Sequence, residues 1–324
     1  MKTETADNIV DFIRAKGQAT AKELTAHFMI SYQAVFKQLK KLQTSGRLKK
    51  IGSAPKVYYI INEPAENFNT EALNQKLARI VEENYFIITP AGEMKKGVAG
   101  FAYWCAKQNL PIEKTAGEYV KTLAKYQAYK KGGIISGLLK LRQTFTPVNL
   151  NELFYLDFYS IERFGKTKLG QLLLYSKQSQ NRKLIRQLAE EIKPQVEKII
   201  SRHKISAVGF IPPTVKREVQ FMKELKNFLG LALPLIAITK IKTPIIIPQK
   251  TLNKLQDRIE NARSTFVVDE NTKYNNILLI DDAVGSGATL NEIAGRIKQK
   301  NFARKIIGLA ITGSFKGFDV ISEV

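Results

Sequence analysis

Apolar residues near the start of the chain recur at helical spacing in three short runs. The first run predicts a helix over residues 7–16, and Thr20 and Ser31 are typical N-caps for two further helices. Residues 48–60 contain two apolar stretches separated by turn-forming residues, which predicts a β-hairpin. Three helices followed by a hairpin are the pattern of a winged helix-turn-helix domain, which we place at residues 1–61.

The third of these helices has two different faces. Val35, Leu39 and Leu42 share a face that is expected to pack in the core, whereas another face is polar and basic. On that face Gln33 suits an adenine edge, Phe36 suits a thymine methyl, and lysines suit phosphates. The predicted DNA-binding residues, including two lysines of the hairpin, are Ser31, Tyr32, Gln33, Phe36, Lys37, Lys40, Lys41, Lys50 and Lys56. The competing interpretation places Phe36 in the core of a protein-binding domain and leaves the lysines as an ordinary solvated face.

The middle of the chain, residues 62–150, is predicted to be a linker followed by a mainly helical segment. Helical periodicity covers 70–83, 97–108 and 112–130. Within the segment four aromatic residues lie at helical spacing and are expected to be core residues: Trp104, Tyr119, Tyr126 and Tyr129. Coupling of the two ends of the chain, or dimerisation, is the expected role of this segment.

A short stretch near the C-terminal end carries the clearest chemistry. Residues 277–280 are four bulky apolar residues that predict a buried parallel strand, and Asp281 and Asp282 follow directly. A glycine-rich turn at 285–287 then opens a helix, which is the arrangement of a phosphate cradle. The carboxylates suit the hydroxyls of a sugar, or a metal held through water. A Rossmann-type turn is the alternative, but its third small residue would fall at Leu290.

This stretch resembles the phosphoribosyl-pyrophosphate motif of type I phosphoribosyltransferases. The resemblance implies that Asp281 and Asp282 hold ribose hydroxyls. It implies that the 5′-phosphate is bound by the residues of the turn and the first helical residues, with serine replacing the usual threonine: Gly285, Ser286, Gly287, Ala288 and Thr289. It also implies Mg²⁺ accompanying phosphoribosyl pyrophosphate, without direct metal ligands from the protein.

Upstream segments resemble the ComF-type members of that family. Residues 248–252 with Arg258, Asn261 and 266–268 resemble a Q-x-x-L…R…N…F segment. Residues 209–213, followed by Lys216 and Arg217, resemble a strand that leads into the pyrophosphate-side loop, and Gly170-Gln171-Leu172 with Lys177 resembles the approach to that core. We therefore predict a ComF-like domain over 151–324, a parallel sheet flanked by helices, within an α/β multidomain chain.

Two departures from the family limit what the domain is expected to do. ComF-type proteins usually begin with a cysteine-rich zinc module, but Cys105 is the only cysteine, so a four-ligand zinc site of that kind is impossible. Purine-transferring members place a general-base aspartate where this chain has Gly285. We therefore assign no catalytic residue and expect ligand binding with weak or no turnover.

Composition adds broad constraints. The chain of 324 residues has a formal net charge of +22, which favours polyanionic partners, although the basic residues are spread along its whole length. The polar start lacks the apolar region of a signal peptide, and the longest apolar run is too short to span a bilayer. A single cysteine agrees with a reducing compartment. These features predict a cytoplasmic protein without a membrane segment.

The combination resembles the purine operon repressor family, in which the same two folds are joined. It predicts a DNA-binding regulator that binds double-stranded DNA, senses phosphoribosyl pyrophosphate or a nucleotide, and forms a homodimer. The alternatives are an active phosphoribosyltransferase and a ComF-like accessory factor in DNA uptake or repair.

Overall fold

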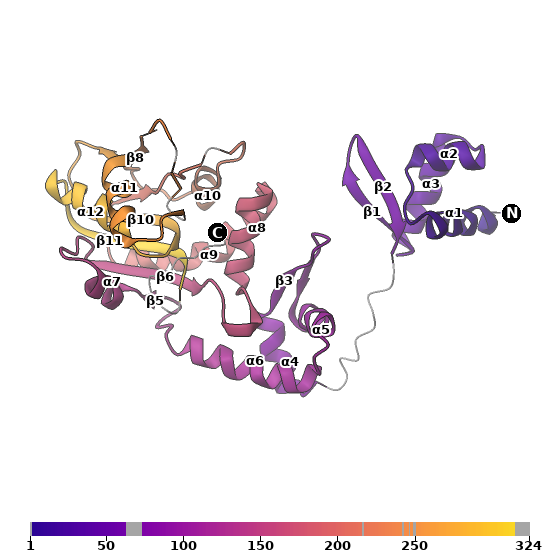
Figure 1. Ribbon diagram of the computed structural model, residues 1–324, viewed down its shortest axis with the longest axis horizontal. Helices are drawn as coiled ribbons and strands as arrows, with labels where there is room; N and C mark the ends of the chain where they lie inside the picture. The colour runs from indigo at the N-terminus through magenta and orange to yellow at the C-terminus, as the bar shows by residue number, and fades with distance from the viewer. Residues whose placement is uncertain are drawn as a thin grey trace. The chain divides into compact units, whose positions relative to one another are not determined.

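The computed structural model shows a mixed α/β chain that divides into two compact units, residues 1–69 and 70–324 (Figure 1). It describes residues 2–62, 73–215, 217–241, 243–245, 247–248 and 251–314. Within these ranges every helix is too short or too polar to span a bilayer.

Residues 2–62 of the first unit form three helices and one hairpin. The helices are α1 (Lys2–Lys16), α2 (Ala21–Phe28) and α3 (Tyr32–Thr44), and the antiparallel strands are β1 (Leu48–Ser53) and β2 (Lys56–Ile61). Gly52 has a φ of +78° in the hairpin, and a Cβ there would lie 2.3 Å from the carbonyl oxygen of Lys56. A side chain at this position would therefore force the hairpin apart.

Helix caps and a small apolar core stabilise the fold of this unit. Thr20 and Glu23 form a reciprocal capping box at the start of α2, and the Ser31 hydroxyl accepts a hydrogen bond from the Ala34 amide at 3.2 Å. Val35, Leu39 and Leu42 are buried, together with residues of α1, α2 and β2. The predicted core face of the third helix is thus confirmed.

The second unit is built on a five-stranded sheet of order β5-β6-β11-β10-β7. Its strands are β5 (Ile135–Ser136), β6 (Glu152–Phe158), β7 (Ala207–Phe210), β10 (Tyr274–Val284) and β11 (Ala303–Gly313). The last four are parallel, and β5 is antiparallel to β6. A separate antiparallel pair is formed by β8 (Ala237–Lys240) and β9 (Phe266–Asp269). The prediction of a parallel sheet in this part of the chain is confirmed.

Helices cover both faces of the sheet. Ile277 and Leu279 pack on the side of α12 (Ala288–Gln299), whereas Leu278 and Ile280 pack on the other side. That other side carries α8 (Lys168–Ser179), α9 (Arg182–Arg202) and α10 (Phe221–Leu229), and α11 (Leu255–Thr265) lies next to α12. Burial on both faces explains why β10 is apolar at successive positions.

The segment that precedes β6 belongs to the same compact unit as the sheet. It contains α4 (Gln75–Asn84), β3 (Phe86–Ile88), β4 (Met94–Lys96), α5 (Gly97–Lys107), α6 (Ile112–Gln127) and α7 (Leu138–Thr144), and a short 3-10 turn, η1 (Glu162–Phe164), follows β6. Tyr119 and Tyr126 are buried and Trp104 packs partly buried against the same core, but Tyr129 is 51% exposed. The prediction was wrong for Tyr129 because α6 ends at Gln127, so helical spacing no longer applies there.

Candidate functional site

The carboxyl ends of β10 and β7 meet at one edge of the sheet. Ile280 of β10 pairs with Phe210, the last residue of β7, and Asp281 and Asp282 follow. Strand β10 itself continues to Val284 because β11 still pairs with it there. The two aspartates therefore lie inside the end of the strand, on a stretch that β7 no longer covers, and not after it as the sequence pattern suggests. Ligands of open parallel sheets bind at such edges.

A cavity of about 260 Å³ opens at this edge. The described members of the predicted ligand-binding set all line it, namely Arg217, Asp281, Asp282, Gly285, Ser286, Gly287, Ala288 and Thr289. Lys216 lies outside the described residues. Lys177, Thr214 and Arg258 also line the cavity, although none of them was among the predicted ligand-binding residues.

One end of the cavity is formed by the start of α12. Gly287 has a φ of +79°, a conformation that glycine adopts without strain, and no side chain caps the helix at that residue. The buried Ser286 hydroxyl accepts a hydrogen bond from the Ala288 amide at 3.3 Å. An uncapped helix start that opens onto a cavity favours an anion.

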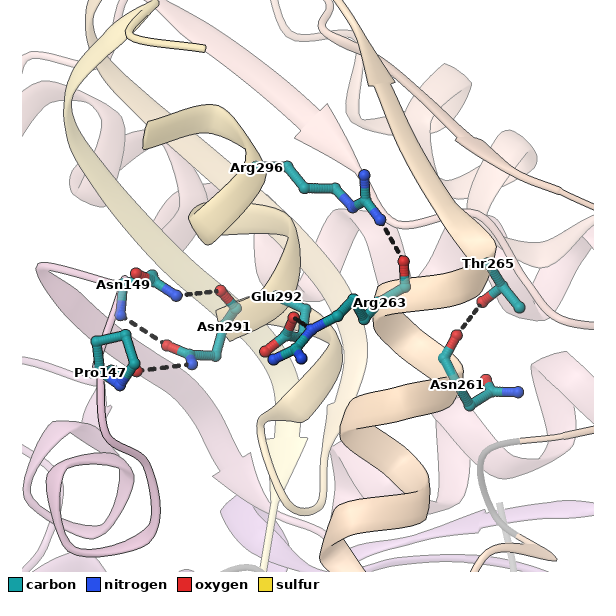
Figure 2. A network of polar contacts seen from close by, with 8 residues as sticks. All are labelled: Pro147, Asn149, Asn261, Arg263, Thr265, Asn291, Glu292 and Arg296. Carbon is teal, nitrogen blue, oxygen red and sulfur yellow. Dashed lines mark hydrogen bonds and ion pairs between the residues drawn. The ribbon is translucent and has the colours of Figure 1, made fainter. Parts of the chain in front are cut away.

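Hydrogen bonds hold α12 from two sides (Figure 2). The side chain of buried Asn291 accepts a hydrogen bond from the Asn149 amide at 2.8 Å and donates one to the Pro147 carbonyl at 3.2 Å. On the side of α11, the Arg296 guanidinium donates to the Arg263 carbonyl. The helix whose start opens onto the cavity is therefore held by contacts that need no ligand, which would lower the cost of binding an anion there.

The acidic pair is surrounded by cations from distant elements. Lys177 Nζ, on α8, lies 2.7 Å from an Asp282 carboxylate oxygen, and both side chains are about one-fifth exposed, at 21% and 22%. Lys240 Nζ, on β8, donates to the Thr214 hydroxyl at 2.8 Å. Burial, followed by the negative charge of Asp282, raises the pKa of Asp281 to about 8, although Lys177 and Lys240 act in the opposite direction.

Mg²⁺ needs an octahedral set of oxygen ligands, commonly one or two carboxylates with water and phosphate oxygens. Here Asp282 already binds the Lys177 ammonium, and Asp281 accepts a hydrogen bond from the Asp282 amide at 2.8 Å. In the part of the chain that the structure describes, no three His, Cys, Asp or Glu side chains gather around a common point. The acidic pair in this arrangement does not fit a directly bound magnesium ion.

The raised pKa of Asp281 has a consequence for stability. A carboxyl with a higher pKa in the folded state than in the unfolded chain stabilises the fold at low pH, and this contribution is lost as pH rises through the folded-state value of about 8. The Asp281→Asn variant has no carboxyl to ionise at this position, so its stability does not fall in this way as the pH rises. We expect the variant to be more stable than wild type by about 0.5–2 kcal/mol at ~pH 9, with the difference shrinking towards ~pH 4.

Urea unfolding across this pH range measures the effect. Asp282→Asn is the control, because it removes the partner of Lys177 and should lower stability instead. An Asp281→Asn protein with the same stability difference from wild type at both pH extremes would contradict the assignment.

A second candidate surface lies on the first unit. Every residue of the predicted DNA-binding set is exposed there. Tyr32 and Phe36 are 47% and 49% exposed, with ring centroids 5.7 Å apart, so the interpretation of Phe36 as a core residue is wrong. Met29, which the sequence pattern did not single out, is 92% exposed at the end of α2. Aromatic, apolar and basic side chains are thus presented together by α3 and the turn before it.

Comparisons with known proteins give little further guidance. No family model matches the chain, and no curated protein matches it. Among solved structures, the chain is weakly similar to a crystal structure of adenine phosphoribosyltransferase, with 14% sequence identity and a TM-score of 0.29. The match covers 45% of this chain and 78% of that one. A similarity at this TM-score does not establish the chemistry of the site.

Proposed function

We propose that this protein is a DNA-binding regulator whose second unit senses a phosphoribosylated metabolite. The observation that carries the proposal is the cavity at the sheet edge, where an acidic pair and an uncapped helix start face one space. Carboxylates accept hydrogen bonds from ribose hydroxyls, and the helix start binds a phosphate. Phosphoribosyl pyrophosphate and nucleotides carry both groups. Magnesium would enter with the pyrophosphate of the former, not through the aspartates.

The first unit supplies the DNA-binding half of the proposal. Its three helices and hairpin have the order of a winged helix-turn-helix domain, with α3 as the recognition helix. Gln33 and Phe36 are the proposed base contacts, and Lys37, Lys40 and Lys41 are the proposed phosphate contacts, all exposed on α3. Helix-turn-helix proteins commonly bind as dimers to paired half-sites, so we also propose that this protein forms a homodimer. We place it in the cytoplasm.

Thermodynamic linkage explains how ligand binding by the second unit would control DNA binding by the first. A ligand changes DNA affinity only if it binds the DNA-competent and DNA-incompetent conformations with different affinities. A regulator needs the ligand bound and released unchanged, which agrees with Gly285 standing where purine-transferring relatives place a general base.

Calorimetry tests the sensing half. The full-length protein should bind phosphoribosyl pyrophosphate or a nucleoside 5′-monophosphate, and the double variant Asp281→Asn, Asp282→Asn should bind either at least about tenfold more weakly. The affinity for inorganic phosphate should change less, because phosphate has no ribose hydroxyls to donate hydrogen bonds to the aspartates.

A matched control removes two exposed carboxylates elsewhere in the same unit, Asp257→Asn with Asp269→Asn, and should leave binding unchanged. Absence of heat with every phosphoribosyl compound would overturn the sensor model.

A further inference from the structure

The charge balance of the cavity points to one class among the phosphoribosyl ligands. In the described part of the chain, its charged lining residues are Lys177, Arg217 and Arg258 against Asp281 and Asp282. Three cations therefore line the same cavity as two acidic side chains, of which Asp281 is largely protonated at neutral pH because its pKa is raised to about 8. Lys240 lies outside the lining but close enough to Asp281 for their charges to interact, which adds a fourth cation. The site is net positive without any metal ion.

Lys177 is the cation that contacts the acidic pair directly. Its ammonium lies 2.7 Å from the Asp282 carboxylate, and about four-fifths of each side chain is removed from solvent. Pairs at this depth are screened far less than surface pairs, so the ammonium strongly affects what else can approach Asp282. A divalent cation on the same carboxylate would have to displace the lysine.

The position of Lys177 is fixed by the neighbouring loop. The Arg217 guanidinium donates a hydrogen bond to the Lys177 carbonyl, and the Val219 amide donates one to the Gln180 side chain at 2.9 Å. The last turn of α8 is thereby tied to the loop that lines the cavity. The main chain of Lys177 is therefore held in the wall of the cavity, and its side chain extends from a fixed position.

A phosphate monoester matches the charge of this wall. Such a group carries about −1.5 to −2 at neutral pH, which the surplus positive charge of the cavity can balance. A 1-pyrophosphate adds several negative charges, which are normally neutralised by Mg²⁺. Magnesium would then bring two further positive charges beside Lys177.

We propose that this pocket, as the ligand site of the proposed function, binds a ribosyl 5′-phosphate monoester such as a nucleoside 5′-monophosphate without magnesium. Lys177 selects this class by occupying the place on Asp282 that a divalent cation would take. The 5′-phosphate lies at the start of α12, and the ribose hydroxyls face the acidic pair. Lys177 is thus a specificity-determining residue, and the effector is a nucleotide and not the magnesium complex of phosphoribosyl pyrophosphate.

The test uses full-length protein and two probes, ribose 5-phosphate and phosphoribosyl pyrophosphate, each titrated by calorimetry in EDTA and in excess MgCl₂. Wild type should bind ribose 5-phosphate with the same affinity in both buffers. Lys177→Ala should weaken that binding about tenfold or more in EDTA, because the unneutralised carboxylate repels the phosphate, and MgCl₂ should restore part of the loss. Lys177→Arg should retain metal-independent binding.

Lys168→Ala is the matched control, since Lys168 lies on the same helix and pairs with Glu191 at 2.6 Å, outside the cavity lining. It should bind like wild type in both buffers. Wild-type binding that requires MgCl₂, or that occurs only with phosphoribosyl pyrophosphate, would overturn this inference and leave the proposed function standing. The wild-type titrations distinguish these outcomes even if Lys177→Ala fails to fold. Binding of neither probe in either buffer would overturn this inference, and the proposed function falls as well if nucleoside 5′-monophosphates also give no heat.

Discussion

Removal of residues 1–61 is expected to lower affinity for duplex DNA at least ~100-fold at salt near 0.15 M, because the truncation removes the whole proposed DNA-binding domain. The second unit has its own sheet and its own two cores, so the remaining chain should still fold. Electrophoretic mobility shift or fluorescence anisotropy measures the loss. Truncated protein that binds duplex as tightly as full-length protein would contradict the assignment of the first unit.

Side-chain variants in the full chain locate the effect on α3. Replacing Lys37, Lys40 and Lys41 together with glutamine removes three exposed cations, and the slope of log affinity against log salt should fall by about 0.9 for each phosphate that is no longer neutralised. A control variant removes three exposed lysines of the second unit, Lys114, Lys121 and Lys223, with the same change in net charge. Its salt slope should stay at the wild-type value. Gln33→Ala should instead relax sequence preference, by ~1–3 kcal/mol at one base pair.

The elements of the first unit were predictable because each boundary has a local cause. Thr20 and Ser31 cap α2 and α3 where the sequence indicates, and each is followed by a periodic apolar run. Helix α1 begins earlier than the predicted residue 7. Ala6 is buried there, so the apolar face extends beyond the run that the large side chains mark. A small residue such as alanine contributes little to the apolar periodicity, so the sequence pattern did not locate the start of this helix.

Among the described lining residues, the sequence indicated one contiguous stretch and, through the family resemblance, the distant Arg217. Residues 281–289 are close in sequence because one strand, one turn and one helix start form the cradle. Lys177 lies 105 residues from its partner Asp282, and no periodicity connects them. The same is true of Asn149, which holds Asn291 across 142 residues. Contacts of this kind depend on the sheet order, which local patterns do not specify.

The chemistry of the acidic pair could not be predicted from the sequence either. Two adjacent aspartates indicate a site for sugar hydroxyls or a hydrated metal equally well. Their burial and the approach of Lys177 distinguish the two possibilities, and both arise from tertiary packing of α8 against the sheet. Under the proposed function, magnesium would enter with the pyrophosphate of one ligand class and not through the protein's carboxylates.

Occupation of the sheet-edge cavity is expected to change the affinity of the protein for DNA. A coupling free energy of about 1–3 kcal/mol is typical of such regulators and corresponds to a change of about 5–150-fold in duplex affinity. The size of the effect depends on the difference in ligand affinity between the two conformations, not on how tightly the ligand binds. The second unit should therefore alter DNA binding without contributing a DNA contact of its own.

The most direct measurement is duplex affinity by fluorescence anisotropy, using a duplex selected from a random pool by the protein itself. It is repeated with no ligand, with saturating nucleoside 5′-monophosphates and with phosphoribosyl pyrophosphate. At least one of these ligands should shift wild-type affinity by about fivefold or more, and the shift should vanish in the Asp281→Asn, Asp282→Asn variant. If a ligand binds wild-type protein by calorimetry and yet duplex affinity is the same with and without it, the protein is not the ligand-controlled regulator proposed above.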